Sequence, residues 1–203
     1  MPKATDSLPA DCRKRLLAAA TEVFMAEGYR ASIERIACRA GVARQTLYNH
    51  FPSKELLFEA VVGATVQSVV VTLEAKTGDL RASLLSFATV YREKILNPGA
   101  LAACRTLIAE APRFAGLARN FLAAGPESTV GHVARFLARA MERGELRSDD
   151  PQLAAEVLTG MLTGYERLNG LLNGGVVMTD NSARTGRIVD VFLRAYRSER
   201  GQT

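Results

Sequence analysis

Two short helical patterns separated by one glycine, over residues 33–50, constrain this chain more than any other part of its sequence. Gly41 stands where the turn between them needs a left-handed backbone conformation. Ala37 stands where two helices cross too closely for a larger side chain. Each helix is too short to be stable alone, so the pair must pack on a further helix. The spacing predicts a helix-turn-helix whose small core is formed by Ile36, Ala40, Val42 and Leu47.

Apolar residues at helical spacing occupy most of the remaining chain and predict an all-α fold of about nine helices. The fourth helix is expected to begin after Pro52, with Ser53 as its N-cap, and to run to about residue 75. Glycine and proline punctuate the later helices, for example at Gly125-Pro126. We expect an N-terminal three-helix helix-turn-helix domain over residues 1–52 and a larger helical domain over residues 53–203.

The second helix of the pair carries polar side chains that suit a nucleic-acid groove. Its exposed face is expected to contain Arg44, Gln45, Thr46, Tyr48 and Asn49. Such side chains reach base edges or phosphates in a major groove, and an arginine can hold guanine O6 and N7 with two hydrogen bonds. The chain has a formal net charge of +5, and over half of this excess lies within residues 1–57. Taken singly, each of these residues could instead be core or solvated surface, but their joint spacing favours DNA binding.

The run GVARQTLYNHFPSKELL, over residues 41–57, resembles the DNA-binding signature of the TetR family of repressors. The resemblance implies that Arg44, Gln45 and Asn49 read bases. It also implies that other side chains contact phosphates or support the recognition helix, namely Thr46, Tyr48, His50 and Lys54.

Two positions depart from the usual family pattern. The family usually has Ser or Thr where this chain has Ala43, and the loss of such an N-cap costs about 0.5–2 kcal/mol. The stretch that leads into the preceding helix is one residue shorter than usual. Either Ala31 or Ser32 is therefore expected to begin that helix, with Ser32 as its only cap and as the residue available for the phosphate contact that the family makes there.

The C-terminal part shows a second resemblance, because residues 104–114 and 144–151 are similar to the regulatory domains of AcrR- and AefR-like members. This implies an apolar effector cavity and a homodimer interface built from the last two long helices. A two-fold dimer places its recognition helices about 34 Å apart, which suits palindromic double-stranded DNA. The expected function is a repressor released from its operator by a small-molecule inducer. A ligand-independent regulator or an activator would share every motif.

Two sets of residues are candidates for these C-terminal sites. The candidates for the dimer interface are Leu153, Val157, Met161, Leu168, Ile188, Val189, Phe192 and Tyr196. The candidates for the effector site mix apolar surface with a few polar groups, as ligand cavities do, and are Phe87, Tyr91, Cys104, Leu107, Ile108, Phe121, His132, Phe136 and Tyr165. Ordinary core packing is the alternative for both sets. The helix over residues 53–75 is expected to transmit effector binding to the recognition helix.

Other functional classes find little support. The three cysteines are scattered, and neither they nor the two histidines have the spacing of a metal site. Without a glycine-rich phosphate loop, an enzyme is the least favoured reading, and no cofactor or metal is expected. The apolar stretch over residues 60–71 is interrupted by Thr65, Gln67 and Ser68, and the N-terminus lacks an apolar leader segment. We therefore expect no membrane span and a cytoplasmic location.

Overall fold

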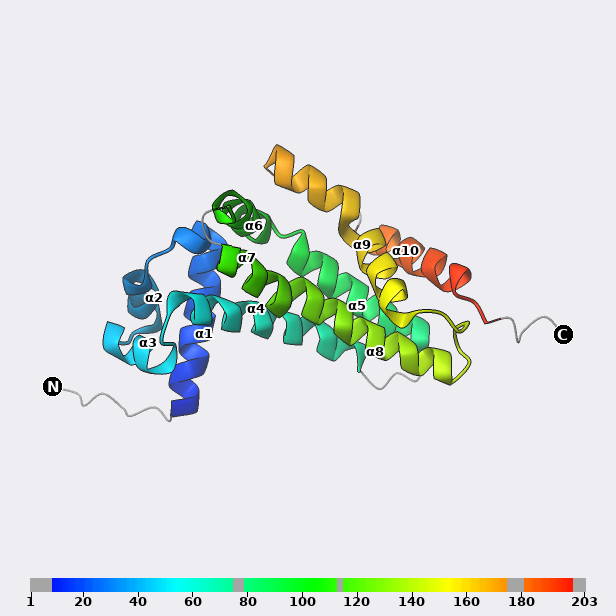
Figure 1. The fold of residues 1–203 in the computed structure, drawn as a ribbon, viewed down its shortest axis with the longest axis horizontal. Coiled ribbons are helices and arrows are strands. Elements are labelled where there is room, and N and C mark those ends of the chain that lie inside the picture. The colour runs from blue at the N-terminus through cyan, green and yellow to red at the C-terminus, as the bar shows by residue number, and fades with distance from the viewer. Residues whose placement is uncertain (1–8, 75–78, 113–114, 175–180, 199–203) are drawn as a thin grey trace.

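The computed structural model describes residues 9–74, 79–112, 115–174 and 181–198, and within these ranges it contains helices and no β-strand. The prediction of an all-α fold is confirmed. Figure 1 shows an elongated molecule with the first three helices at one end and the last helix toward the other. An isolated β-bridge between Leu146 and Arg197 ties the loop before the penultimate helix to the end of the last one.

The N-terminal end is a three-helix unit. Helix α1 (Pro9–Glu27) is followed by the 3-10 helix η1 (Gly28–Arg30), and then by α2 (Ile33–Ala40) and α3 (Arg44–His50). The side chains expected to form the core between α2 and α3 do so: Ile36, Ala40 and Leu47 are buried, and Val42 is half-buried against them. This small core includes Leu16 and Phe24 of α1, so α1 supplies the packing surface that the two short helices need.

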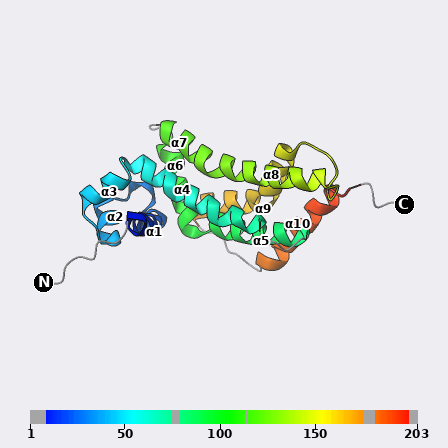
Figure 2. The same cartoon turned by 90° about the horizontal axis from the view of Figure 1, so that it is seen from below.

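Helix α4 (Lys54–Val70) continues into the 3-10 helix η2 (Val71–Leu73) and belongs to two hydrophobic cores. Its start is set by Ser53, as predicted, because the Ser53 Oγ accepts a hydrogen bond of 3.2 Å from the Leu56 N–H. Phe58 packs edge-on against Phe24 in the N-terminal core, with ring centroids 5.2 Å apart. Val69 lies in the second core. Figures 1 and 2 show α4 leading from the helix-turn-helix into the larger part of the molecule.

The segment Lys54–Leu73 corrects the expectation that its polar interruptions leave no stretch long and apolar enough to cross a membrane. Its 20 residues have a mean hydropathy of 1.9 in their most apolar window, which is long and apolar enough to cross a membrane despite the polar interruptions. In the fold, Leu56 and Val71 of this segment are exposed, while many of its apolar residues are fully or nearly buried, namely Leu57, Phe58, Val61, Val66, Val69, Val70 and Leu73. High hydropathy here therefore accompanies a helix that packs on two cores, which requires apolar side chains around most of its circumference.

The larger part of the molecule is built around the second core. Besides Val69 of α4 and Leu73 of η2, this core receives residues from α5 (Leu80–Ile95), α8 (Ser128–Glu142), α9 (Pro151–Asn173) and α10 (Asn181–Ala195). Helices α6 (Pro98–Glu110) and α7 (Ala115–Leu122) instead contribute Leu107 and Leu117 to the N-terminal core. They consequently lie between the helix-turn-helix and the second core (Figure 2).

The expected break at Gly125-Pro126 is wrong. Residues 123–127 form a π-helical turn, η3 (Ala123–Glu127), that joins α7 to α8. Pro126 has no N–H to donate, and a wider turn can accommodate this missing hydrogen bond while the chain continues in the same direction. Gly125 is buried, and a Cβ on it would lie 3.0 Å from Val62, so the turn also sits close to α4.

A buried ion pair connects α5 to α9. The Arg92 side chain is 1% exposed, and its guanidinium donates to Glu166 at 2.6 Å from Nη1 and 3.1 Å from Nη2. Nη1 also donates to the Leu162 carbonyl one turn earlier in α9. The hydrogen bonds from Arg92 hold the pKa of Glu166 below its ordinary value, with a smaller contribution from Arg184 of α10. The Glu166 carboxylate of α9 therefore interacts with arginines of two other helices, α5 and α10.

We predict that Glu166→Gln lowers the free energy of unfolding by about 3 kcal/mol, because it leaves the Arg92 charge buried without its counter-ion. The folded-state pKa of Glu166 is depressed, so this stabilisation is complete above the unfolded pKa of about 4.3 and is lost as the pH falls through the folded value. Urea unfolding at a series of pH values measures both effects.

The matched control is Asp190→Asn. It removes the carboxylate of the Arg81–Asp190 pair, 2.7 Å apart, which also joins α5 to a later helix but is exposed to solvent. Exposed pairs contribute little, so this variant should unfold at nearly the wild-type urea concentration. Equal losses in the two variants would show that burial of Arg92 is not what makes Glu166 important.

Candidate nucleic-acid interface

The turn between α2 and α3 has the geometry that its sequence predicted. Gly41 ends α2 with φ = 66°, a left-handed conformation that favours glycine. Ser32 caps the other end of α2, where its Oγ accepts a hydrogen bond of 3.2 Å from the Arg35 N–H. Both ends of α2 are thus defined by the residues that the sequence analysis singled out.

Helix α3 begins without a side-chain cap. Ala43 occupies the N-cap position in an extended conformation, with φ = −70° and ψ = 150°, and makes no side-chain hydrogen bond to the helix. The helix is held from below, because Leu47 is fully buried and Phe51 at its C-cap is nearly so. The Arg13 guanidinium lies 5.1 Å from the centre of the Phe51 ring. Tertiary contacts therefore stabilise α3 in place of a side-chain cap.

The three side chains expected to read bases lie together on the outer face of α3. Arg44, Gln45 and Asn49 are all exposed. Gln45 Nε2 donates to Asn49 Oδ1 at 3.0 Å, so these two amides are already oriented relative to each other. The Arg44 guanidinium lies 5.4 Å from the centre of the Tyr48 ring on the next turn. The face therefore offers several hydrogen-bond donors and acceptors on one short helix.

The residues expected to contact phosphates or to support α3 surround this face. Thr46, Tyr48 and His50 are half-buried, and Ser32 is exposed although its hydroxyl also serves as the cap of α2. The Lys54 ammonium lies 4.6 Å from the centre of the Tyr29 ring. Burial lowers the pKa of Lys54, an effect that the charges of nearby glutamates oppose. The sequence analysis placed all of these residues correctly next to the recognition helix, while their contacts with DNA stay a prediction.

Two further residues that hold this surface were not identified from the sequence. Arg15 of α1 donates from Nη2 to the Ala40 carbonyl at 2.6 Å and to the Gly41 carbonyl at 3.3 Å, which clamps the turn onto α1. Glu34 of α2 forms an ion pair with Arg44, whose Nη1 lies 2.8 Å from a carboxylate oxygen of Glu34. Each contact joins different helices, and from the sequence both side chains look like ordinary surface charges. No local pattern could have found them.

Comparisons with known proteins identify the family. Residues 82–198, more than half of the chain, match the family described as "AefR-like transcriptional repressor, C-terminal domain", and residues 16–61 match "Bacterial regulatory proteins, tetR family". The chain belongs to the TetR family. It is therefore a DNA-binding transcription regulator, and not an enzyme.

Individual TetR family relatives extend over the chain to different degrees. The transcriptional repressor BepR of Brucella suis is 29% identical over 187 residues, which cover 84% of this chain and 85% of BepR. The transcriptional activator FasR of Mycolicibacterium smegmatis is 48% identical, but only over 65 residues, which cover 31% of this chain and 30% of FasR.

Solved structures show the same fold. A TetR family protein from Mesorhizobium loti superimposes with a TM-score of 0.76 at 28% identity, covering 95% of this chain and 100% of that one. The flavonoid-responsive regulator FrrA gives a TM-score of 0.64 at 29% identity, covering 94% of this chain and 99% of FrrA.

The effector candidates of this TetR family chain are divided between the two cores and the surface. Leu107 and Phe121 belong to the N-terminal core, whereas Phe87, Tyr91 and Phe136 belong to or pack on the second core. Two more are on the surface, where Ile108 is 56% and Tyr165 is 75% exposed. The remaining two bind neighbouring side chains or backbone, with Cys104 Sγ 3.4 Å from Arg167 Nη2 and His132 Nδ1 2.7 Å from the Ser128 carbonyl.

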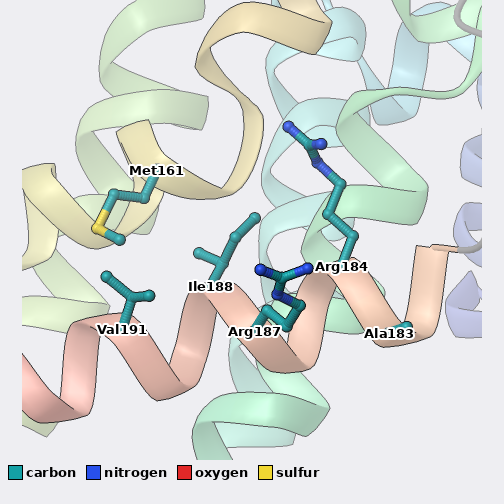
Figure 3. A pocket seen from close by; sticks show the side chains of 6 residues that line it. All are labelled: Met161, Ala183, Arg184, Arg187, Ile188 and Val191. Atoms are coloured by element: carbon teal, nitrogen blue, oxygen red, sulfur yellow. The ribbon is translucent and has the colours of Figure 1, made fainter.

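A pocket of about 480 Å³ lies between α9 and α10. Figure 3 shows Met161 of α9 above Ile188 and Val191 of α10, with Arg184 and Arg187 farther along α10. None of the effector candidates lines this pocket. Met161 and Ile188 were expected at the dimer interface instead, so the pocket opens on the face proposed for a second subunit.

The candidates for the dimer interface divide by helix. On α9, Leu153, Val157, Met161 and Leu168 are exposed, as residues that meet a partner must be in a single chain. On α10, Ile188 is half-buried, but Val189 and Phe192 of this helix and Tyr196 directly after it are placed wrongly, because they are buried in the chain's own second core. The outward apolar side chain of α10 is Val191, 43% exposed.

We predict that Ala43→Ser stabilises the protein by about 0.5–1 kcal/mol, since the extended backbone at Ala43 lets a serine hydroxyl accept from the start of α3. Ser32→Ala should have the opposite effect, a loss of about 1 kcal/mol, because it removes the existing cap of α2. Urea unfolding monitored by circular dichroism compares both variants with the wild type. A destabilised Ala43→Ser variant would mean that the start of α3 cannot use a side-chain cap.

Proposed function

We propose that this regulator is a cytoplasmic repressor that binds a palindromic operator as a homodimer and leaves it when a small molecule binds its larger domain, residues 53–203. The observation that carries the proposal is the outer face of α3, where Arg44, Gln45 and Asn49 are exposed while Leu47 anchors the opposite face. The family membership supplies DNA binding, and the residue roles below are our assignment.

Base reading is assigned to the three exposed side chains of α3. Arg44 can give two donors to guanine, and Gln45 or Asn49 can pair with both N6 and N7 of adenine. Phosphate contact or support of the recognition helix is assigned to the residues that surround these three side chains, namely Ser32, Thr46, Tyr48, His50 and Lys54. Phosphate contacts set the position of a protein on the duplex without reading its sequence.

The homodimer is supported by an apolar stripe along α9. Six exposed side chains recur every three or four residues and therefore share one face of the helix: Leu153, Val157, Met161, Tyr165, Leu168 and Leu172. Gly160 and Gly164 on the same helix have open space beside them, which allows a partner helix to approach closely. A stripe of this length on a surface is typical of an interface.

Small-molecule release rests on family likeness and on the contacts of α6. The name of FrrA states that it responds to flavonoids, and that protein covers nearly the whole of this chain. Helix α6, which carries three of the effector candidates, contacts α1 and η1, which belong to the same N-terminal unit as the helix-turn-helix. Glu110 pairs with Arg30 of η1, and Gly99 lies so close to the Met25 carbonyl that a Cβ would be 2.6 Å from it.

These contacts offer a second route by which effector binding in the larger domain can move the N-terminal helices. The sequence analysis expected α4 to transmit effector binding, and a shift of α6 would also move α1 and η1. An effector needs only to favour a conformation in which the two recognition helices no longer match successive major grooves.

Activation of transcription is the second candidate function. It is favoured by the 48% identity to the activator FasR, which is confined to 65 residues. The repressor BepR matches over 187 residues and therefore includes the larger domain, so we favour repression. A reporter gene controlled by the operator DNA of this protein distinguishes repression from activation. Deletion of a repressor raises expression of the reporter, and deletion of an activator lowers it.

The roles of Arg44 and Lys54 predict different losses. Arg44→Ala should lower the preference for the operator over random DNA by about tenfold, because one bidentate base contact is worth about 1–3 kcal/mol. Lys54→Ala should weaken binding to both DNAs alike and reduce the salt dependence of binding by about one phosphate contact. The operator is first obtained by selecting bound duplexes from a random-sequence pool at a stated salt concentration, and affinities follow from fluorescence anisotropy.

Two outcomes of that experiment would contradict the proposal. A selected sequence without two-fold symmetry would exclude a symmetric dimer on DNA. Equal losses on operator and random DNA for Arg44→Ala would remove its assignment to base reading.

The proposed dimer predicts that an aspartate at either of two exposed leucines has a different effect on the oligomeric state. Leu168→Asp, at a position 55% exposed on the α9 stripe, should convert the dimer to a monomer, because it would bury a carboxylate against apolar side chains. Leu122→Asp, at a position 47% exposed on α7 outside the stripe, is the matched control and should remain dimeric. Sedimentation velocity measures both, and a dimeric Leu168→Asp protein would place the interface elsewhere.

A further inference from the structure

A negative charge stands next to the residue proposed to read bases. Glu34, in the first turn of α2, forms an ion pair with Arg44, with 2.8 Å between Arg44 Nη1 and a Glu34 carboxylate oxygen, and both side chains are more than half exposed. The same guanidinium is held from its other side by the Tyr48 ring, 5.4 Å from its central carbon. Arg44 is thus held between a carboxylate on α2 and an aromatic ring on its own helix.

This arrangement leaves part of the guanidinium available. Arginine has five N–H donors in a planar fork, and the ion pair with Glu34 is made through Nη1. Donors of the fork that neither Glu34 nor Tyr48 engages can still meet a guanine. An arginine that is already oriented loses less conformational entropy when it binds, so a correct base contact gains from the pairing.

The same carboxylate disfavours DNA that offers no such contact. Phosphates brought near α3 meet the charge of Glu34, and this charge also acts on Lys54, where it opposes the burial that lowers the pKa of the ammonium. An acid among cations on a DNA-facing surface weakens the sequence-independent attraction, which comes almost entirely from phosphates. Specificity grows when wrong complexes are penalised as well as right ones favoured.

We propose that Glu34 is a positioning residue for Arg44, and that it raises operator specificity both by orienting the guanidinium and by repelling random DNA. The inference rests on the proposed role of α3 in reading bases. It assigns a function to an acidic residue on a surface where only cations and amides would be expected to contribute.

The test compares Glu34→Gln with a matched control, Glu22→Gln. Glu22 pairs with Arg39 at 2.5 Å on the same three-helix unit, and Glu22 and Glu34 are each 57% exposed, but Arg39 is not on the recognition helix. Both substitutions remove one negative charge and so raise the net charge of the protein by one unit. Anisotropy titrations at about 100 mM salt measure binding to the duplex selected by the wild type and to a random-sequence duplex.

Glu34→Gln should bind random DNA about threefold more tightly and lose about tenfold of its preference for the selected duplex. Glu22→Gln should keep the wild-type preference. Glu34→Asp retains the charge but shortens the side chain, so it should lose preference without binding random DNA more tightly. In an Arg44→Ala background, Glu34→Gln should no longer change the preference, because the residue through which it acts is missing.

The outcomes separate this inference from the function on which it rests. If the wild type selects no sequence, the proposed base reading is wrong, and the role of Glu34 falls with it. If the wild type selects a duplex and Glu34→Gln keeps the same preference as Glu22→Gln, only the role of Glu34 is wrong. A variant that loses affinity for both DNAs equally would show that Glu34 merely stabilises the fold, which also overturns the proposal.

Discussion

Burial of Leu47 is the contact on which the recognition surface depends. Helix α3 has only seven residues and no side-chain cap at Ala43, so it has little stability of its own. Leu47 is fully buried against α1 and α2, and this fixes the rotation of α3 about its axis. Once Leu47 is fixed inward, a rotation of about 100° per residue turns Gln45 and Asn49 to the opposite side, while Arg44 is exposed because it is the first residue of the helix. The Arg15 hydrogen bonds to the preceding turn complete the attachment.

The two cores of the molecule are connected by shared helices rather than by a flexible linker. Helix α4 contributes to both, and α6 and α7 place Leu107 and Leu117 in the N-terminal core although they follow α5 in the chain. The recognition unit therefore rests on elements of the larger domain. This arrangement gives a physical route from a change in the larger domain to the orientation of α3, because packed helices shift as units and not as independent side chains.

Polar contacts in this protein specify positions that apolar packing leaves open. Apolar side chains decide which face of a helix is inside, but several rotations and registers bury similar areas. The Arg92 guanidinium donates to both the Glu166 carboxylate and the Leu162 carbonyl. These two bonds together set the position of α5 relative to α9. The Glu34–Arg44 pair acts in the same way at the surface, where it selects one orientation of a long side chain.

Local patterns were sufficient for much of this structure. Gly41 at the turn, the caps Ser32 and Ser53, and the inward Leu47 were all predicted, because each depends on residues within one or two helical turns. The family signature lies in this same region, so the class of function was also accessible from the sequence. The boundary between domains after residue 52 stays a prediction.

Contacts between distant segments decided the rest. Helix α10 is apolar on more than one side, and only packing shows that Val189 and Phe192 face inward while Val191 faces out. The effector candidates were chosen by residue type, yet they fall into two cores and the surface, because composition does not say which helix meets which. The sequence by itself determined the helix-turn-helix and its polar face, whose contacts are local. The tertiary structure alone decided the partners of Arg15, Arg92 and Arg44 and the apolar stripe left open on α9, since these depend on how separate helices pack.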